Sequence, residues 1–257
     1  MSRTCAVALV MLPLVLTGCL HMHMDTVIEK DGSGTFTLNY SMSETVAASL
    51  KELQELEMPG QEDIDEAPTL DDFKKEEIEK ACKEHGVKLQ KFERATVDGR
   101  ETLEIVLAFK NPNDLSAALA ATMEHQGGLQ LFKTSDGDYT LQVVEVEEIT
   151  DAEEPDASYE ADAEEEPSMQ EMDPEQMEKS MQIMGELMTS ISELDIAMRI
   201  TVPGEIKQHN AQRIEGQTLI WEINSANMMS MGSEQNMEPD IVFSGQGIDI
   251  DVPTWQQ

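Results

Sequence analysis

The chain has 257 residues, of which 40% are hydrophobic and only 4% aromatic, and its 52 acidic residues against 17 basic ones give a formal net charge of -35. A chain with this composition cannot bury all of its length in one core, so we expect a single modest domain accompanied by solvated segments. The same negative field repels phosphate backbones, and the sequence contains no basic stripe to offset it. Nucleic acid is therefore not expected as a partner.

Residues 1–18 have the layout of a secretory signal peptide. Arg3 precedes an apolar run from Cys5 to Leu16, which is too short to span a bilayer but fits the hydrophobic region of an export signal. The run ends in Leu16-Thr17-Gly18-Cys19, which resembles the lipobox of bacterial lipoproteins. The resemblance implies cleavage before Cys19 and acylation of its thiol. The alternative is an ordinary signal peptide in which Cys19 is incidental.

Acylation of Cys19 would attach the chain to a membrane of the cell envelope without a transmembrane helix. Leu20 follows the cysteine, where an aspartate would retain a lipoprotein at the inner membrane. This favours the periplasmic face of the outer membrane if the host has two membranes. Removal of residues 1–18 would leave Cys82 as the one free thiol, so no intramolecular disulfide is expected.

Asp-Gly pairs between stretches of alternating hydrophobicity predict β-hairpins, because aspartate and glycine tolerate the positive φ of tight turns. Three such turns, at Asp31-Gly32, Asp98-Gly99 and Asp136-Gly137, join residues 23–30 with 35–41, 87–97 with 101–109, and 129–133 with 139–146.

A further strand is predicted over 194–202, where five apolar residues alternate with Asp195, Ala197, Arg199 and Thr201. This pattern indicates a sheet with one apolar face and one face toward water. A last hairpin is predicted at Glu215-Gly216.

Four helices are predicted between the hairpins. Ser41 and Glu44 have the spacing of a capping box for the first, residues 71–85 form the second, Asn113 caps the third, and the fourth begins at Pro174. The order of hairpins and helices predicts an α+β fold: a mostly antiparallel sheet built from hairpins, with helices packed on one face.

Two segments do not fit a core. Eighteen acidic residues and no Lys or Arg lie between positions 134 and 178, so residues from about 147 to 172 are predicted to be a disordered acidic insertion. Residues 227–257 are predicted to be a Met-rich, poorly ordered C-terminal tail that adds at most one edge strand. The domain is therefore expected to span residues 19–226.

Short motifs in the mature chain resemble the LppM-like family of bacterial lipoproteins. A lipobox cysteine leads into a strand and the hairpin Asp31 to Gly34, and later an apolar strand enters the turn Val202-Pro203-Gly204, followed by Trp221 in a strand. The resemblance implies an α+β domain similar to lipid-binding folds, with no catalytic residues to carry over. The acidic insertion and the Met-rich tail depart from the family pattern.

Two groups of residues are candidates for binding. Four methionines share one face of the predicted fourth helix and could line a pliable apolar pocket, although this spacing also suits ordinary core packing: Met177, Met181, Met184 and Met188. His21 and His23, interleaved with Met22 and Met24, have the donor types of an extracytoplasmic copper site. In a strand, however, the imidazoles and thioethers point to opposite faces, which is also what a plain edge strand would show.

The sequence contains no nucleophile elbow, zinc-protease motif or phosphate-binding loop. We therefore expect no enzyme and no cofactor. The predicted function is that of a membrane-anchored envelope lipoprotein that binds a lipid or other apolar ligand, or an envelope partner. The alternative is a periplasmic copper-binding lipoprotein that uses His21 and His23.

Overall fold

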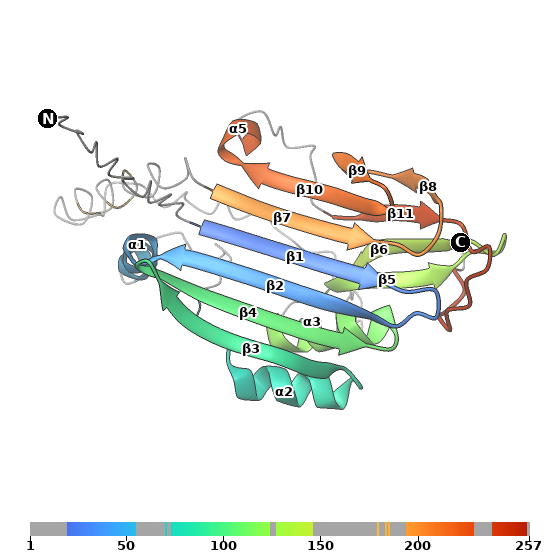
Figure 1. Ribbon diagram of the computed structural model, residues 1–257, viewed down its shortest axis with the longest axis horizontal. Coiled ribbons are helices and arrows are strands. Elements are labelled where there is room, and N and C mark those ends of the chain that lie inside the picture. The colour runs from blue at the N-terminus through green and yellow to red at the C-terminus, as the bar shows by residue number, and fades with distance from the viewer. Residues whose placement is uncertain are drawn as a thin grey trace, which may run out of the picture.

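The computed structural model describes residues 20–54, 70, 73–123, 127–145, 179, 183, 185, 194–228 and 238–255. These residues form an α+β fold with two sheets (Figure 1). The larger sheet has seven strands in the order β3-β4-β2-β1-β7-β10-β9, and the smaller has four in the order β5-β6-β11-β8. The strands are β1 (Leu20–Ile28), β2 (Gly34–Ser43), β3 (Lys88–Val97), β4 (Arg100–Phe109), β5 (Gly127–Lys133), β6 (Tyr139–Glu145), β7 (Leu194–Thr201), β8 (Ile206–His209), β9 (Arg213–Glu215), β10 (Thr218–Asn224) and β11 (Asp240–Phe243).

The three hairpins with Asp-Gly turns are confirmed as the pairs β1–β2, β3–β4 and β5–β6. The β3–β4 turn shows why its two residues are needed, since Asp98 and Gly99 both have positive φ, 53° and 73°. The fourth predicted hairpin is confirmed as β9–β10. The hairpins form because each turn is encoded locally, next to the strands that it joins.

The seven-stranded sheet is antiparallel except where β1 pairs with β7. This pairing joins the N-terminal hairpins to the strands that follow residue 193, and it brings Leu20 opposite Leu194. Figure 1 shows β1 and β7 side by side in the middle of the sheet, with α3 (Pro112–Met123) and the β5–β6 hairpin behind it. One face of the large sheet is therefore covered and carries the core.

Both helix caps that the sequence analysis assigned are displaced. The sequence placed the first cap at Ser41, but β2 continues to Ser43, whose Oγ accepts a hydrogen bond from the Val46 N–H at 3.3 Å as α1 (Glu44–Gln54) begins. The sequence placed the cap of the third helix at Asn113, but it is Asn111 whose Oδ1 accepts a hydrogen bond from the Asn113 N–H, at 2.9 Å. Pairing of β2 out to Ser43 delays the start of α1, and the Asn113 side chain bonds the backbone of Leu131 and not the helix end.

The prediction of a poorly ordered tail over 227–257 is wrong for residues 238–255. Strand β11 lies between β6 and β8, in the interior of the smaller sheet. Ile241 and Phe243 are fully buried, and Ile248 and Ile250 are buried beyond them. The extent of the ordered segment was missed because these four buried residues, spread over ten positions, give no periodicity strong enough to predict an element.

The C-terminal segment also ties the two sheets together through the backbone. Ile250 N–H donates to Tyr139 Oη at 3.0 Å, and Asp249 N–H donates to the Lys30 carbonyl at 3.2 Å, beside the first hairpin turn. Further along, Trp255 N–H donates to the Lys133 carbonyl at 2.8 Å. The domain therefore extends at least to residue 255, and the boundary at 226 must be moved.

A single apolar cluster fills the space between the sheets and the helices. It takes residues from both sheets, among them Leu38, Trp221 and Phe243, and from α2 (Lys75–Glu84) through Ile78 and Cys82. A short helix, α5 (Ser225–Met228), follows β10. The predicted acidic insertion at about 147–172 lies outside the described residues.

Candidate functional site

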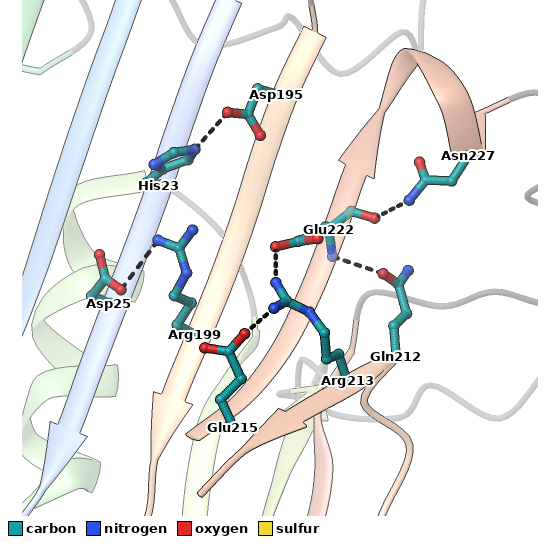
Figure 2. Close-up of polar contacts among 9 residues, drawn as sticks. All are labelled: His23, Asp25, Asp195, Arg199, Gln212, Arg213, Glu215, Glu222 and Asn227. Carbon is teal, nitrogen blue, oxygen red and sulfur yellow. Dashed lines mark hydrogen bonds and ion pairs between the residues drawn. The ribbon is translucent and has the colours of Figure 1, made fainter. Parts of the chain in front are cut away.

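The open face of the large sheet carries polar and charged side chains, several of them paired across neighbouring strands (Figure 2). Because successive side chains in a strand alternate between faces, the odd-numbered residues of β1 and β7 share this face. The parallel register places His21 opposite Asp195 and Asp25 opposite Arg199. We call this surface the polar face.

His21, His23 and Asp195 form a cluster at the start of β1 and β7. Asp195 Oδ2 lies 3.0 Å from His23 Nε2 and 3.5 Å from His21 Nδ1, so one carboxylate oxygen faces both imidazoles. The side chains are 36%, 29% and 41% exposed, in the order His21, His23, Asp195, so solvent reaches all three. One ligand atom from each residue lies within 4.8 Å of the other two, which is close enough for one metal ion.

A second set of charge pairs continues along the polar face. Arg199 Nη1 lies 3.5 Å from Asp25 Oδ1. On β9, Arg213 pairs with Glu215, and its Nη2 lies 2.7 Å from Glu222 Oε1 on β10 (Figure 2). These half-exposed pairs each contribute little to stability, since solvent screens them, but they fix complementary charge across the strands.

The opposite face of β1, β7 and β10 is apolar and changes along its length. Near the end of the sheet where β11 lies, Ile200, Leu219 and Trp221 are fully buried. Toward the start of β1 the apolar side chains are only half-buried, and we call this set the apolar patch: Leu20, Met22, Met24, Leu194, Ile196, Met198 and Ile223. The patch lies directly behind the histidine cluster, on the other side of the same strands.

The structure brings together the two histidines that the sequence singled out and adds Asp195 to them. The alternating pattern of residues 194–202 predicts that Asp195 lies on the water-facing side of its strand, but it does not show that this strand pairs with β1. Met22 and Met24 lie on the apolar face, paired with the β2 residues Tyr40 and Leu38. They do not join the histidines in one metal site.

The remaining predicted site residues lie outside the described residues. These are the lipobox, Leu16, Thr17, Gly18 and Cys19, and the methionines Met177, Met181, Met184 and Met188. Within the predicted fourth helix, residues 179, 183 and 185 are helical, and Ile183 is buried.

Cys82 lies on the buried side of α2. Burial raises the pKa of its thiol, and the negative charge of Glu79 raises it further. A thiol held protonated in this way is a poor nucleophile. This favours a packing role for Cys82.

Among the described helices, none has both the length and the apolar composition needed to span a bilayer.

No protein-family model matches the chain, and no curated protein matches it. Among solved structures, the chain is similar to the folded domain of LppM from Mycobacterium tuberculosis, determined by NMR. The match covers 88% of this chain and 89% of that one, at 10% sequence identity and a TM-score of 0.42.

Proposed function

We propose that the chain is a lipoprotein of the bacterial cell envelope, anchored through Cys19, whose folded domain binds an apolar ligand without catalysis. The observation that carries the proposal is that β1 begins at Leu20, the residue directly after the lipobox cysteine. With no linker between them, an acylated Cys19 would hold this end of the sheet against the membrane surface. In a host with two membranes, we place the protein on the periplasmic face of the outer membrane.

The apolar patch supports a lipid as the ligand. Leu20, Met22 and Met24 follow the anchor position immediately, so half-buried apolar side chains would lie within reach of acyl chains. Three of the seven patch residues are methionines, whose flexible thioether side chains adapt to irregular apolar ligands. The face behind them is polar, so a ligand would enter from one side of the sheet only.

The side-chain chemistry of the chain supports a function without catalysis. The sequence has none of the common nucleophile motifs, and Cys82 is buried with a raised thiol pKa. The polar face holds charge pairs that satisfy one another, such as Arg199 with Asp25. These features suit a binding module better than an enzyme.

The anchor is tested by metabolic labelling with an alkyne fatty acid. We expect the wild-type protein to take up the label and Cys19→Ala to take up none and to keep its signal peptide. Cys82→Ala is the matched control and should label like the wild type. Label that persists in Cys19→Ala would contradict the anchor.

The ligand is tested with an environment-sensitive apolar dye on the full chain in mild detergent, and by mass spectrometry of small molecules that purify with it. We expect saturable dye binding that is lost in Met24→Glu, which places a charge in the apolar patch. Asn39→Glu adds the same charge on the exposed polar face of β2 and should bind like the wild type. Equal binding by both variants would remove the patch from the proposal.

A further inference from the structure

The histidine cluster has the geometry of a metal site built across two strands. His21 and His23 are two residues apart on β1, so their imidazoles project from one face, and the parallel register supplies Asp195 from β7. Asp195 Oδ2 lies 3.5 Å and 3.0 Å from the nearest imidazole nitrogens. Three donors of suitable type therefore already face one another.

The spacing of these donors is close to that of coordinated ligands. A tetrahedral ion with bonds of about 2.0–2.1 Å separates its ligand atoms by roughly 3.3 Å. The three donor atoms lie within 4.8 Å of one another, so modest rotation of these half-exposed side chains brings the donor atoms to the spacing of coordinated ligands. Because each of the three side chains is 29–41% exposed, water can fill the remaining coordination positions.

The donor set selects the class of ion. Two neutral imidazoles and one carboxylate suit borderline divalent ions such as Zn²⁺ and Cu²⁺, whereas Mg²⁺ and Ca²⁺ prefer oxygen donors. Met22 and Met24 project from the opposite face, so the site lacks the thioethers that favour Cu(I). The net charge of -35 on the chain raises the local concentration of cations in general.

We propose that His21, His23 and Asp195 bind one divalent transition-metal ion, Zn²⁺ or Cu²⁺, with water in the open positions. The bound ion joins β1 to β7, the one parallel strand pair among the described strands. It therefore links β1, which follows the anchor position, to the part of the domain that begins with β7. This site is independent of the ligand assigned to the apolar patch.

The test is calorimetric titration of the full chain in mild detergent with Zn²⁺ and, separately, Cu²⁺. Millimolar Mg²⁺ is kept in the buffer to occupy diffuse acidic sites. We expect one equivalent of ion to bind to the wild type, and at least tenfold weaker binding in His23→Gln and in Asp195→Asn. His209→Gln is the matched control, because His209 is an exposed histidine on β8 of the other sheet and should leave binding unchanged.

A second measurement reports the coordination itself. Co²⁺ in place of Zn²⁺ should give the visible absorption bands of a site with nitrogen and oxygen ligands, and these bands should vanish in His21→Gln. Circular dichroism verifies that each variant is folded. The proposal is overturned if folded His23→Gln and Asp195→Asn bind Zn²⁺ and Cu²⁺ as the wild type does, or if the wild type binds neither ion in the presence of Mg²⁺.

Discussion

Replacement of Phe243 by alanine tests whether the C-terminal segment belongs to the core. Phe243 is fully buried on β11 and stacks on Tyr139 of β6, with ring centroids 5.5 Å apart and an interplanar angle of 17°. Truncation of the ring removes apolar contacts and leaves a cavity between the two sheets. The neighbouring residue Val242 points to the other face of β11 and is half-buried, which makes Val242→Ala a matched control.

The expected loss follows from burial. A Phe→Ala change in a packed core costs about 3–5 kcal/mol, including the cavity that remains. For a protein of this size each kcal/mol lowers the melting temperature by about 2–4 °C, so Phe243→Ala should lower it by roughly 6–20 °C. Val242→Ala removes two half-buried methyl groups and should cost only about 1 kcal/mol.

The assay is thermal unfolding followed by circular dichroism, repeated with urea to obtain the free energy of unfolding. Both variants are compared with the wild type at the same protein and detergent concentrations. If Phe243→Ala melts no lower than Val242→Ala, residues 238–255 do not pack as described, and the prediction of a loose tail would stand.

Three further predictions concern other parts of the chain. Gly34→Ala should lower the melting temperature clearly, because the new Cβ would lie 2.0 Å from the Val27 carbonyl oxygen and 2.4 Å from Phe109 Cζ. Gly185→Ala is the control: its Cβ would lie in open space, so the melting temperature should stay unchanged or rise. Exchange of residues 147–172 for a short Gly-Ser linker should not lower the melting temperature, since it removes mutually repelling charges and shortens the connection between β6 and β7. A large cooperative loss would place the segment in the core. The hydrogen bond from Lys207, reinforced by the Gly245 N–H, holds the pKa of Asp138 below its ordinary value. A carboxylate with a lowered folded-state pKa stabilises the fold above its unfolded pKa of about 3.9 and loses that contribution as pH falls through the folded-state value. Asp138→Asn should therefore melt below the wild type at neutral pH, and the gap should close in acid; a gap that does not change with pH would argue against this pairing.

Local features of the fold could be predicted from the sequence. Each Asp-Gly turn is encoded next to the strands that it joins, and Asp98 and Gly99 adopt the positive φ that the pattern requires. The alternation in β7 likewise predicted that Asp195 and Arg199 share one face of the strand, although Ala197 on the same face is buried. Such features depend on residues that are neighbours in the chain, and a sequence pattern records them directly.

The candidate site could be predicted only in part. The sequence places His21 and His23 on one side of a strand, because side chains alternate with a period of two. It contains no record of which strand lies beside them, since Asp195 is 172 residues away from His23. The third ligand of the proposed metal site therefore became visible only in the tertiary structure.

By itself, the sequence determined the α+β class and the hairpins, and it contains the lipobox-like motif on which the proposed anchor at Cys19 rests. The tertiary structure decided the parallel pairing of β1 with β7, the division into two sheets, and the interior place of β11. These features depend on the burial of apolar side chains such as Ile241 and Phe243 against residues distant in the chain. Burial of this kind is a property of the packed core as a whole, and a short segment such as Asp240–Phe243 does not show it in its own sequence.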